Sequence, residues 1–306
     1  MAITLIENFR AVFYGPFYAA CALGAYEREG IEVTIKTSTD PANTVNFLVS
    51  GEGEVSWGGP LRILFTLEKT PAARPVAFCE VVGRDPFFLV GREPRPNFRL
   101  PDLRGRRLAT VSEVPTPWMC LQRDLRNAGL DPSAIDRIGG ASMADNVEAL
   151  RQGRADVIQV FQPYAAQLET EGKGHIWYAA ASRGLTSYTT LNTTRAFLER
   201  EPEVALKMCR AIVRTQKWIG AHDGADLAEA IGHYFPGLPR SVLADSFRQY
   251  QSLGVWNASP LLKPEGFDWL RDAALDAGLL RAPISYADCV DMRFAERAAR
   301  EDPPSL

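Results

Sequence analysis

Residues 1–93 alternate short apolar runs with amphipathic segments, and glycine or proline separates most of them. Compact runs of apolar and β-branched residues predict strands, whereas apolar residues that recur every three or four positions predict helices. The pattern predicts strands over 3–8, 31–37, 54–57, 76–82 and 87–90, and helices over 17–29, 41–49 and 61–69. This alternation indicates a largely parallel sheet that is covered on both faces.

The proline-rich segment Glu93–Asn97 interrupts this pattern, which then starts again. After it, the sequence predicts strands over 107–111, 135–138, 157–160 and 176–180, and helices over 117–128, 146–152 and 164–171. A β-rich run at 187–192 comes next, and the remainder predicts only helices, over 195–198, 202–222, 225–234, 240–253 and 264–277. The residues after Tyr286 show little pattern, so we expect a loosely held tail there.

The chain is longer than a single hydrophobic core usually grows, so two lobes are expected. Each would be an α/β unit with a mostly parallel sheet flanked by helices. The two interruptions mark the crossings, which gives residues 1–93 plus 190–306 as lobe 1 and residues 94–189 as an inserted lobe 2. Near the first crossing, Arg84 and Asp85 are expected to pair with each other in a turn, unless Arg84 binds a ligand carboxylate.

Composition narrows the class of protein. An apolar content of 46% and a charged content of 23% are typical of globular domains and exclude disorder and coiled coil. Because the net charge is -3 and the basic residues are scattered, we expect no nucleic-acid partner. No apolar run approaches the roughly 18 residues of a membrane span, so we expect a protein that is not membrane-embedded. With Met1 as the native start it would be cytoplasmic, and after removal of a leader it would be periplasmic.

The residues that usually carry metal or covalent chemistry are dispersed. The five cysteines are widely spaced, without CxxC or CxxH pairs, and indicate buried small apolar residues rather than disulfides or a zinc site. The three histidines also lack metal-ligand spacing. Neither a GxSxG elbow nor a phosphate-binding loop occurs in the sequence. We therefore expect no cofactor and no metal.

Two predicted strands of the first lobe end in turns rich in aromatic residues and glycine, at 9–16 and 57–60. In an open α/β sheet, the loops at the carboxyl ends of the strands line the ligand crevice. Aromatic rings there would stack on a flat solute or pack beneath the next helix, and the sequence leaves both open. The candidate ligand contacts on this wall are Asn8, Arg10, Phe13, Tyr14, Trp57, Gly58 and Gly59.

The second lobe offers corresponding turns at 111–118 and 161–164. Thr116 and Pro117 suit the start of a helix, so this turn would aim its N–H groups at the crevice. Glu113 would disfavour a purely anionic ligand, or would only respond to the helix dipole. The candidate contacts here are Ser112, Glu113, Thr116 and Trp118, with Gln162 and Tyr164 as hydrogen-bonding groups and Tyr188 on the returning strand.

Seven stretches, in chain order, carry a family resemblance. They are Asn8 with GPFYAA at 15–20, GAYEREGIEV at 24–33, GEVSWGG at 53–59, DLRGRRLA at 102–109, LRNAGLDP at 125–132, ALRQGRADV at 149–157 and FLEREPE at 197–203. The chain resembles periplasmic-binding-protein-like type II proteins of the sulfonate-binding and thiamine-pyrimidine-synthesis group. The resemblance implies two lobes joined by two hinge strands, which close on a small solute destined for an ABC importer.

We therefore expect a solute-binding protein with a small aromatic or heterocyclic ligand, pyrimidine-, sulfonate- or aromatic-acid-like, and an ABC permease as a further partner. The resembled family also contains enzymes, which keeps open a cytosolic decarboxylase, dehydratase or pyrimidine-precursor synthase on the same scaffold. Glu113 with Tyr14 or Arg10 would then be the acid-base groups. The cysteine-rich run of the eukaryotic pyrimidine synthases is absent here. A third interpretation is a cytosolic sensor that binds a protein partner.

Overall fold

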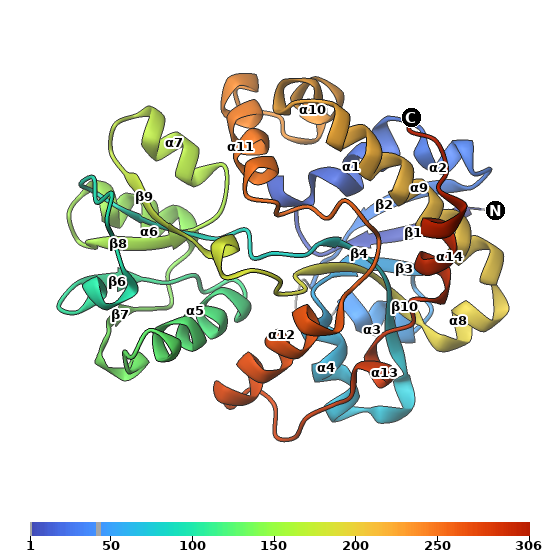
Figure 1. Ribbon diagram of the computed structural model, residues 1–306, viewed down its shortest axis with the longest axis horizontal. Helices are drawn as coiled ribbons and strands as arrows, with labels where there is room; N and C mark the ends of the chain where they lie inside the picture. The colour runs from blue at the N-terminus through green and yellow to red at the C-terminus, as the bar shows by residue number, and fades with distance from the viewer. Residues whose placement is uncertain (1, 41–43) are drawn as a thin grey trace.

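Two separate β-sheets lie side by side in the computed structural model, which describes residues 2–40 and 44–306 (Figure 1). The first sheet has the order β2-β1-β3-β10-β4 and the second the order β7-β6-β8-β5-β9. In each sheet, one strand runs antiparallel to its neighbours: β10 in the first and β5 in the second. The expected two-lobed α/β fold with mostly parallel sheets is confirmed.

The strands of the first sheet are β1 (Ala2–Glu7), β2 (Glu32–Thr37), β3 (Val55–Gly58), β4 (Pro75–Val82) and β10 (Thr189–Thr194). Those of the second are β5 (Phe88–Gly91), β6 (Arg107–Ala109), β7 (Asp136–Ile138), β8 (Val157–Val160) and β9 (His175–Ala179). The strands β3, β4, β5 and β8 are buried along their whole length, which explains their continuous apolar runs.

Helices cover both faces of each sheet. Around the first sheet they are α1 (Gly15–Ala22), α2 (Ala25–Arg28), α3 (Thr44–Val49), α4 (Pro60–Lys69), α8 (Arg195–Arg200), α9 (Pro202–Ala221), α10 (Gly224–Ile231), α11 (Arg240–Ser252), α12 (Pro264–Asp276), α13 (Tyr286–Cys289) and α14 (Arg293–Glu301). Around the second they are α5 (Thr116–Asn127), α6 (Met143–Arg151) and α7 (Tyr164–Thr170). A 3-10 turn, η1 (Val12–Tyr14), leads into α1.

Two helix predictions for the first lobe need comment. The helix expected over 17–29 is divided into α1 and α2, because Gly24 adopts a left-handed conformation with φ of 70°. The helix expected over 41–49 is seen as α3, and residues 41–43, including its predicted first turn, lie outside the described residues.

The first crossing between the sheets differs from the expectation. β5 belongs to the second sheet, between β8 and β9, so the chain crosses at 83–87, before the proline-rich segment Glu93–Asn97. The glycine and proline of GRDPF at 83–87 mark this crossing in the sequence. The sequence analysis instead assigned the predicted strands on both sides of it, 76–82 and 87–90, to the same lobe. We propose residues 2–82 with 189–306 as lobe 1 and residues 88–180 as lobe 2.

A buried charge network joins the two crossings. The Arg183 guanidinium donates to Asp85, at 2.6 Å, and to Asp124 on α5, and all three side chains are at most 6% exposed. The pair expected between Arg84 and Asp85 is therefore wrong, since Asp85 accepts from Arg183 instead. Burial raises the pKa of the Asp85 carboxyl, while Arg183 acts to lower it.

The expectation of a loosely held tail after Tyr286 is also wrong. Ala295 and Ala298 on α14 are fully buried against α9 and β4. The Asp291 N–H donates to the Ala77 carbonyl of β4, and the Arg210 guanidinium on α9 donates to Glu301 at 2.8 Å. The prediction failed because α14 buries only small alanines, so its apolar stripe is weak in the sequence. The five cysteines are free and, except for the half-buried Cys21, are buried as predicted.

Candidate functional site

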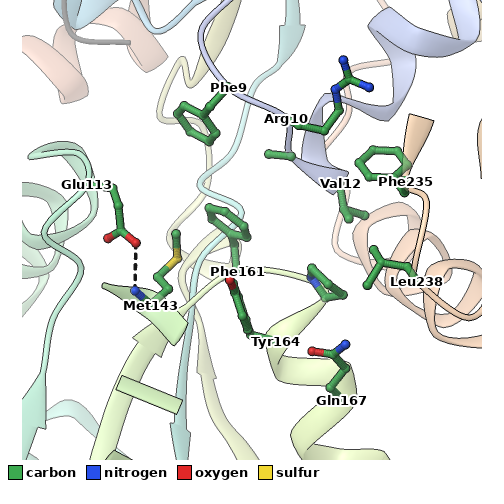
Figure 2. A pocket seen from close by; sticks show the side chains of 12 residues that line it. Phe9, Arg10, Val12, Glu113, Met143, Phe161, Tyr164, Gln167, Phe235 and Leu238 are labelled. Atoms are coloured by element: carbon green, nitrogen blue, oxygen red, sulfur yellow. Dashed lines mark hydrogen bonds between the residues drawn. The ribbon is translucent and has the colours of Figure 1, made fainter. Parts of the chain in front are cut away.

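A cavity of about 470 Å³ lies between the lobes, where the turn after β1 faces the loops after β6 and β8 (Figure 2). The first lobe supplies one wall, through the turn after β1 and the segment between α10 and α11. The second lobe supplies the facing wall. Its lining residues are Phe9, Arg10, Ala11, Val12, Glu113, Met143, Phe161, Pro163, Tyr164, Gln167, Phe235 and Leu238. Its walls are mainly apolar, with few polar groups, which is typical of a small-molecule site.

An aromatic pair spans the cavity from lobe to lobe. The rings of Phe9 and Phe161 lie nearly parallel, at 9°, with their centroids 6.5 Å apart. Phe161 also contacts Phe13 edge-on at 5.3 Å and Tyr164 at 6.2 Å, which fixes the orientation of its ring. The two lobes thus present facing rings, one from each wall.

The first wall is anchored by a carboxylate that the sequence analysis did not select. Glu7 is fully buried and accepts hydrogen bonds from the Tyr18 hydroxyl at 2.6 Å, the Thr37 hydroxyl at 2.5 Å and the Arg10 guanidinium at 2.6 Å. Arg10 also donates to the Tyr234 carbonyl and lies over the rings of Tyr18 and Tyr234. Burial acts to lower the pKa of Arg10, but the hydrogen bond to Glu7, together with the charges of Glu7 and the nearby tyrosines, raises that pKa above its ordinary value.

The second wall places Glu113 opposite Phe9 and Arg10 (Figure 2). Its two oxygens accept from the backbone N–H groups of Met143, at 2.8 Å, and Ser112, at 3.2 Å. Burial, and to a smaller degree the Glu113 charge, raises the pKa of the Tyr164 hydroxyl. Tyr164 thus remains a neutral hydroxyl that can donate into the cavity.

Three candidate contacts from the sequence, Arg10, Glu113 and Tyr164, line this cavity. Ser112 and Trp118 line a second cavity on the other side of the same loop, and Thr116 begins α5. The other candidates lie outside the cavity lining, all but the half-buried Gly59 are buried, and their role as ligand contacts stays a prediction: Asn8, Phe13, Tyr14, Trp57, Gly58, Gly59, Gln162 and Tyr188.

The buried aromatic candidates stack on one another beneath the β1 turn. Trp57 stacks on Phe17 with ring centroids 4.8 Å apart and meets Tyr14 at 5.8 Å. Burial raises the pKa of Tyr14 to about 12, and its hydroxyl accepts from the Asn8 amide. A side chain at Gly58 would come within 2.9 Å of the Asn8 amide, so this glycine permits close packing.

Gln162 has a structural role between the lobes. Its N–H donates to the Tyr250 hydroxyl on α11 at 2.9 Å, and its side-chain amide bonds Gln249 of the same helix. Its side-chain oxygen accepts from the Ala166 N–H in α7. The amide predicted to face a ligand thus joins α7 to α11 in this arrangement.

The sequence analysis missed several lining residues for identifiable reasons. Phe9 and Phe161 each follow a strand directly, so the rule used for Trp57 could have selected them. Phe235 and Leu238 come from a helical segment more than 200 residues after the β1 turn, and no local pattern signals their position. Within residues 2–40 and 44–306, no cluster of three potential metal ligands occurs and no helix is long and apolar enough to cross a membrane.

Comparison with known proteins agrees with this geometry. A family model described as NMT1/THI5 like matches residues 13–225. The chain belongs to the NMT1/THI5-like family. The protein YtlA of Bacillus subtilis (strain 168), named as a candidate binding protein, is 26% identical over 302 residues, which cover 98% of this chain and 90% of that protein.

Two further matches bear on ligand and fold. A 4-amino-5-hydroxymethyl-2-methylpyrimidine phosphate synthase of Schizosaccharomyces pombe is 30% identical over 113 residues, which cover 36% of this chain and 32% of that enzyme. The alkanesulfonate-binding protein SsuA of Xanthomonas axonopodis pv. citri, in a structure with bound MOPS, superposes with a TM-score of 0.72 at 15% identity, covering 95% of this chain and 98% of that one. The latter likeness establishes the fold, as the family resemblance predicted.

Proposed function

We propose that this protein is a solute-binding protein whose lobes close on a small, flat, uncharged or cationic heterocycle, with a pyrimidine-like ring as the best fit. The observation that carries the proposal is the facing pair of Phe9 and Phe161, one ring from each lobe, nearly parallel and 6.5 Å apart.

The spacing of this pair suits a ligand ring between them. Carbon atoms in contact lie about 3.5–4.0 Å apart, so a ring stacked on both faces needs about 7–8 Å between the flanking rings. The centroids lie 6.5 Å apart, so the lobes would have to separate further to admit one planar ring. Stacking on both faces would contribute about 0.5–1.5 kcal/mol per pair beyond the burial of apolar surface.

The charges around the cavity favour a neutral or cationic ligand. Arg10 is the basic residue among the described lining residues, and Glu7 already neutralises it at 2.6 Å. Glu113 adds a carboxylate on the facing wall. A sulfonate or an aromatic acid would lose its hydration beside Glu113 without gaining an unpaired cation. Of the three expected ligand classes, the pyrimidine-like class therefore fits best.

A transport role is proposed from the relatives and the fold. YtlA is named as a candidate binding protein, and SsuA, which shares the fold, is named for binding alkanesulfonates. A protein that captures its solute between two hinged lobes presents a different surface when closed, which a membrane permease of the ABC type can recognise. The permease would be the protein partner and the heterocycle the small-molecule partner.

Calorimetric titration of aminopyrimidines, aromatic acids and alkanesulfonates tests the proposal. We expect an aminopyrimidine to bind and raise the melting temperature, and Phe161→Leu to weaken it at least tenfold, since one stacking face is lost. Phe98→Leu, which removes a ring packed on Trp177 in the second lobe, is the matched control and should leave binding unchanged. Tighter binding of a sulfonate than of any pyrimidine would contradict the ligand assignment.

An enzyme on the same scaffold is the second candidate, favoured by Glu113 and Tyr164, which face one apolar cavity. A carboxylate and a neutral hydroxyl could pass a proton to and from a bound ring. Mass spectrometry of ligand incubated with the protein distinguishes the two functions. Recovery of unchanged ligand supports binding alone, whereas a product formed by the native chain and lost in Glu113→Gln would establish catalysis.

A further inference from the structure

A second cavity, of about 380 Å³, lies where the loop 111–115 and α5 of the second lobe meet the end of α12 from the first. The loop 111–115 lines both cavities, with Glu113 at the first and Ser112 and Val114 at the second. Ala277 and Leu279, directly after α12, complete the second cavity from the other lobe. Because its walls come from both lobes, this cavity is complete only when the lobes lie in the arrangement seen here.

Arg137 gives this cavity its chemistry. Its guanidinium lies over the Trp118 ring with 4.6 Å to the centroid, and its Nε donates to the Thr110 hydroxyl at 2.8 Å. These two contacts hold the guanidinium plane in place. Within the described residues, no carboxylate lies within ion-pair distance of Arg137, and neither terminal nitrogen donates a hydrogen bond to the protein.

The electrostatic surroundings agree with an unneutralised cation. Burial lowers the pKa of Arg137, and no nearby acid opposes that effect. Glu113 is the acidic residue of the shared loop 111–115, and its two oxygens accept hydrogen bonds from the N–H groups of Met143 and Ser112. The two terminal nitrogens of a held guanidinium match the two oxygens of a carboxylate.

The rest of the cavity is suited to an apolar body. Trp118 is half-buried, Met119 is buried, and Leu279 is 38% exposed, which is unusual for a large apolar side chain in this molecule. An apolar group bound against Trp118 and Leu279 would cover both from water. A ligand with a carboxylate at one end and a short aromatic or apolar body at the other satisfies all of these groups.

We propose that this second cavity binds a small organic carboxylate with an aromatic or apolar body, and that its occupation holds the two lobes in the arrangement seen here. The chemistry is opposite to that of the first cavity, where the cation is neutralised and a carboxylate faces the ligand. Because both lobes line the site, the bound anion favours the arrangement seen here over one in which the lobes are further apart.

Benzoate is the probe, and benzamide is its uncharged isostere. We expect benzoate to bind in calorimetric titration and to raise the melting temperature, with benzamide at least tenfold weaker. Arg137→Gln should weaken benzoate at least tenfold and lower the melting temperature of the free protein only slightly, because the part-exposed Arg137 makes no ion pair among the described residues. The matched control is Arg126→Gln, an exposed arginine in the last turn of α5, which should change benzoate affinity less than twofold.

Two further measurements locate the site. Trp118→Phe should remove the change in tryptophan fluorescence that benzoate causes, and Phe161→Leu in the first cavity should leave benzoate affinity unchanged. Equal binding of benzoate to Arg137→Gln, loss of benzoate binding in Phe161→Leu, or no binding at about 10 mM would each overturn the proposal. These outcomes are independent of pyrimidine binding in the first cavity, which Arg137→Gln should not affect.

Discussion

The two walls of the cavity between the lobes are built differently. The first-lobe wall rests on a fully buried carboxylate, Glu7, which three side chains from β2, α1 and the β1 turn saturate. The second-lobe wall rests on exposed loops, where Glu113 accepts from the N–H of Met143 at the start of α6 and the Ser112 hydroxyl donates to the Ala141 carbonyl. Glu113 is exposed to solvent, and Glu7 is not.

This difference teaches which wall can adapt. Moving Glu7 would break several hydrogen bonds to a buried charge, so the first wall is fixed before the ligand arrives. Moving Glu113 breaks two bonds near water, which can replace them. We infer that the first wall sets the position of a bound ring, and that the second wall adjusts to its substituents.

Glu7→Gln gives the largest expected effect. The amide keeps the size but removes the charge that Arg10, Tyr18 and Thr37 share, and leaves the guanidinium without its counter-ion. We expect a loss of about 3 kcal/mol in the free energy of unfolding, measured by urea denaturation. Glu113→Gln should cost less than about 0.5 kcal/mol. If both variants lost the same stability, the two walls would not differ in the way described.

The buried Glu80 on β4 sharpens the comparison, because it is buried like Glu7 but incompletely paired. One oxygen accepts from the Asn257 amide at 2.6 Å, and the Ser187 hydroxyl also acts to lower the pKa of the carboxyl, but no described residue forms an ion pair with Glu80 as Arg10 does with Glu7. Burial raises the pKa of Glu80 from 4.5 to about 8. The folded protein therefore binds a proton that the unfolded chain releases above about 4.5, and stability falls as the pH rises from about 4.5 to 8.

Glu80→Gln should flatten this decline, since the amide cannot ionise. The measurement is the melting temperature of both proteins at intervals between pH 4.5 and 8.5. We expect the melting temperature of the variant to rise relative to that of the native chain as the pH rises, and the two curves of melting temperature against pH to become parallel above about pH 8. An unchanged pH dependence in the variant would show that Glu80 does not titrate in this range.

Glu113→Gln gives the smallest effect on stability and a selective effect on binding. Loss of the carboxylate should weaken a cationic heterocycle several-fold and leave its neutral counterpart within about twofold, because only the former gains from the charge. Titration of a protonated and a neutral pyrimidine at one pH measures both. An equal loss for the two ligands would assign Glu113 to hydrogen bonding rather than to charge.

The sequence predicted most of the fold, because the signals were local. The strands of the described residues were found from short runs of apolar and β-branched residues. The crevice was predicted at four turns: those after β1, β6 and β8 line the cavity, whereas the turn at 57–60 does not. The crossing was misplaced because β5 follows β4 after only five residues, a connection as short as many that join neighbouring strands of one sheet.

Within the site, the residue types were easier to find than their environments. Three of the residues selected from the sequence, Arg10, Glu113 and Tyr164, line the cavity. Trp57 and Tyr14, selected by the same reasoning, are buried outside its lining. An aromatic residue at a strand end has the same local pattern whether its ring faces a ligand or another ring. The neighbours that decide this, Phe17 and the Asn8 amide, act through space.

The sequence by itself determined two α/β lobes and a crevice at the carboxyl ends of their strands, because hydrophobic periodicity and turn residues act over a few positions. Only the tertiary structure decided which rings face each other, which arginine is neutralised and which is not. Glu7 and Arg10 are three residues apart and pair with each other, whereas Arg137 has no ion-pair partner among the described residues. Electrostatic environment depends on distances in space, and these exist only after the chain has folded.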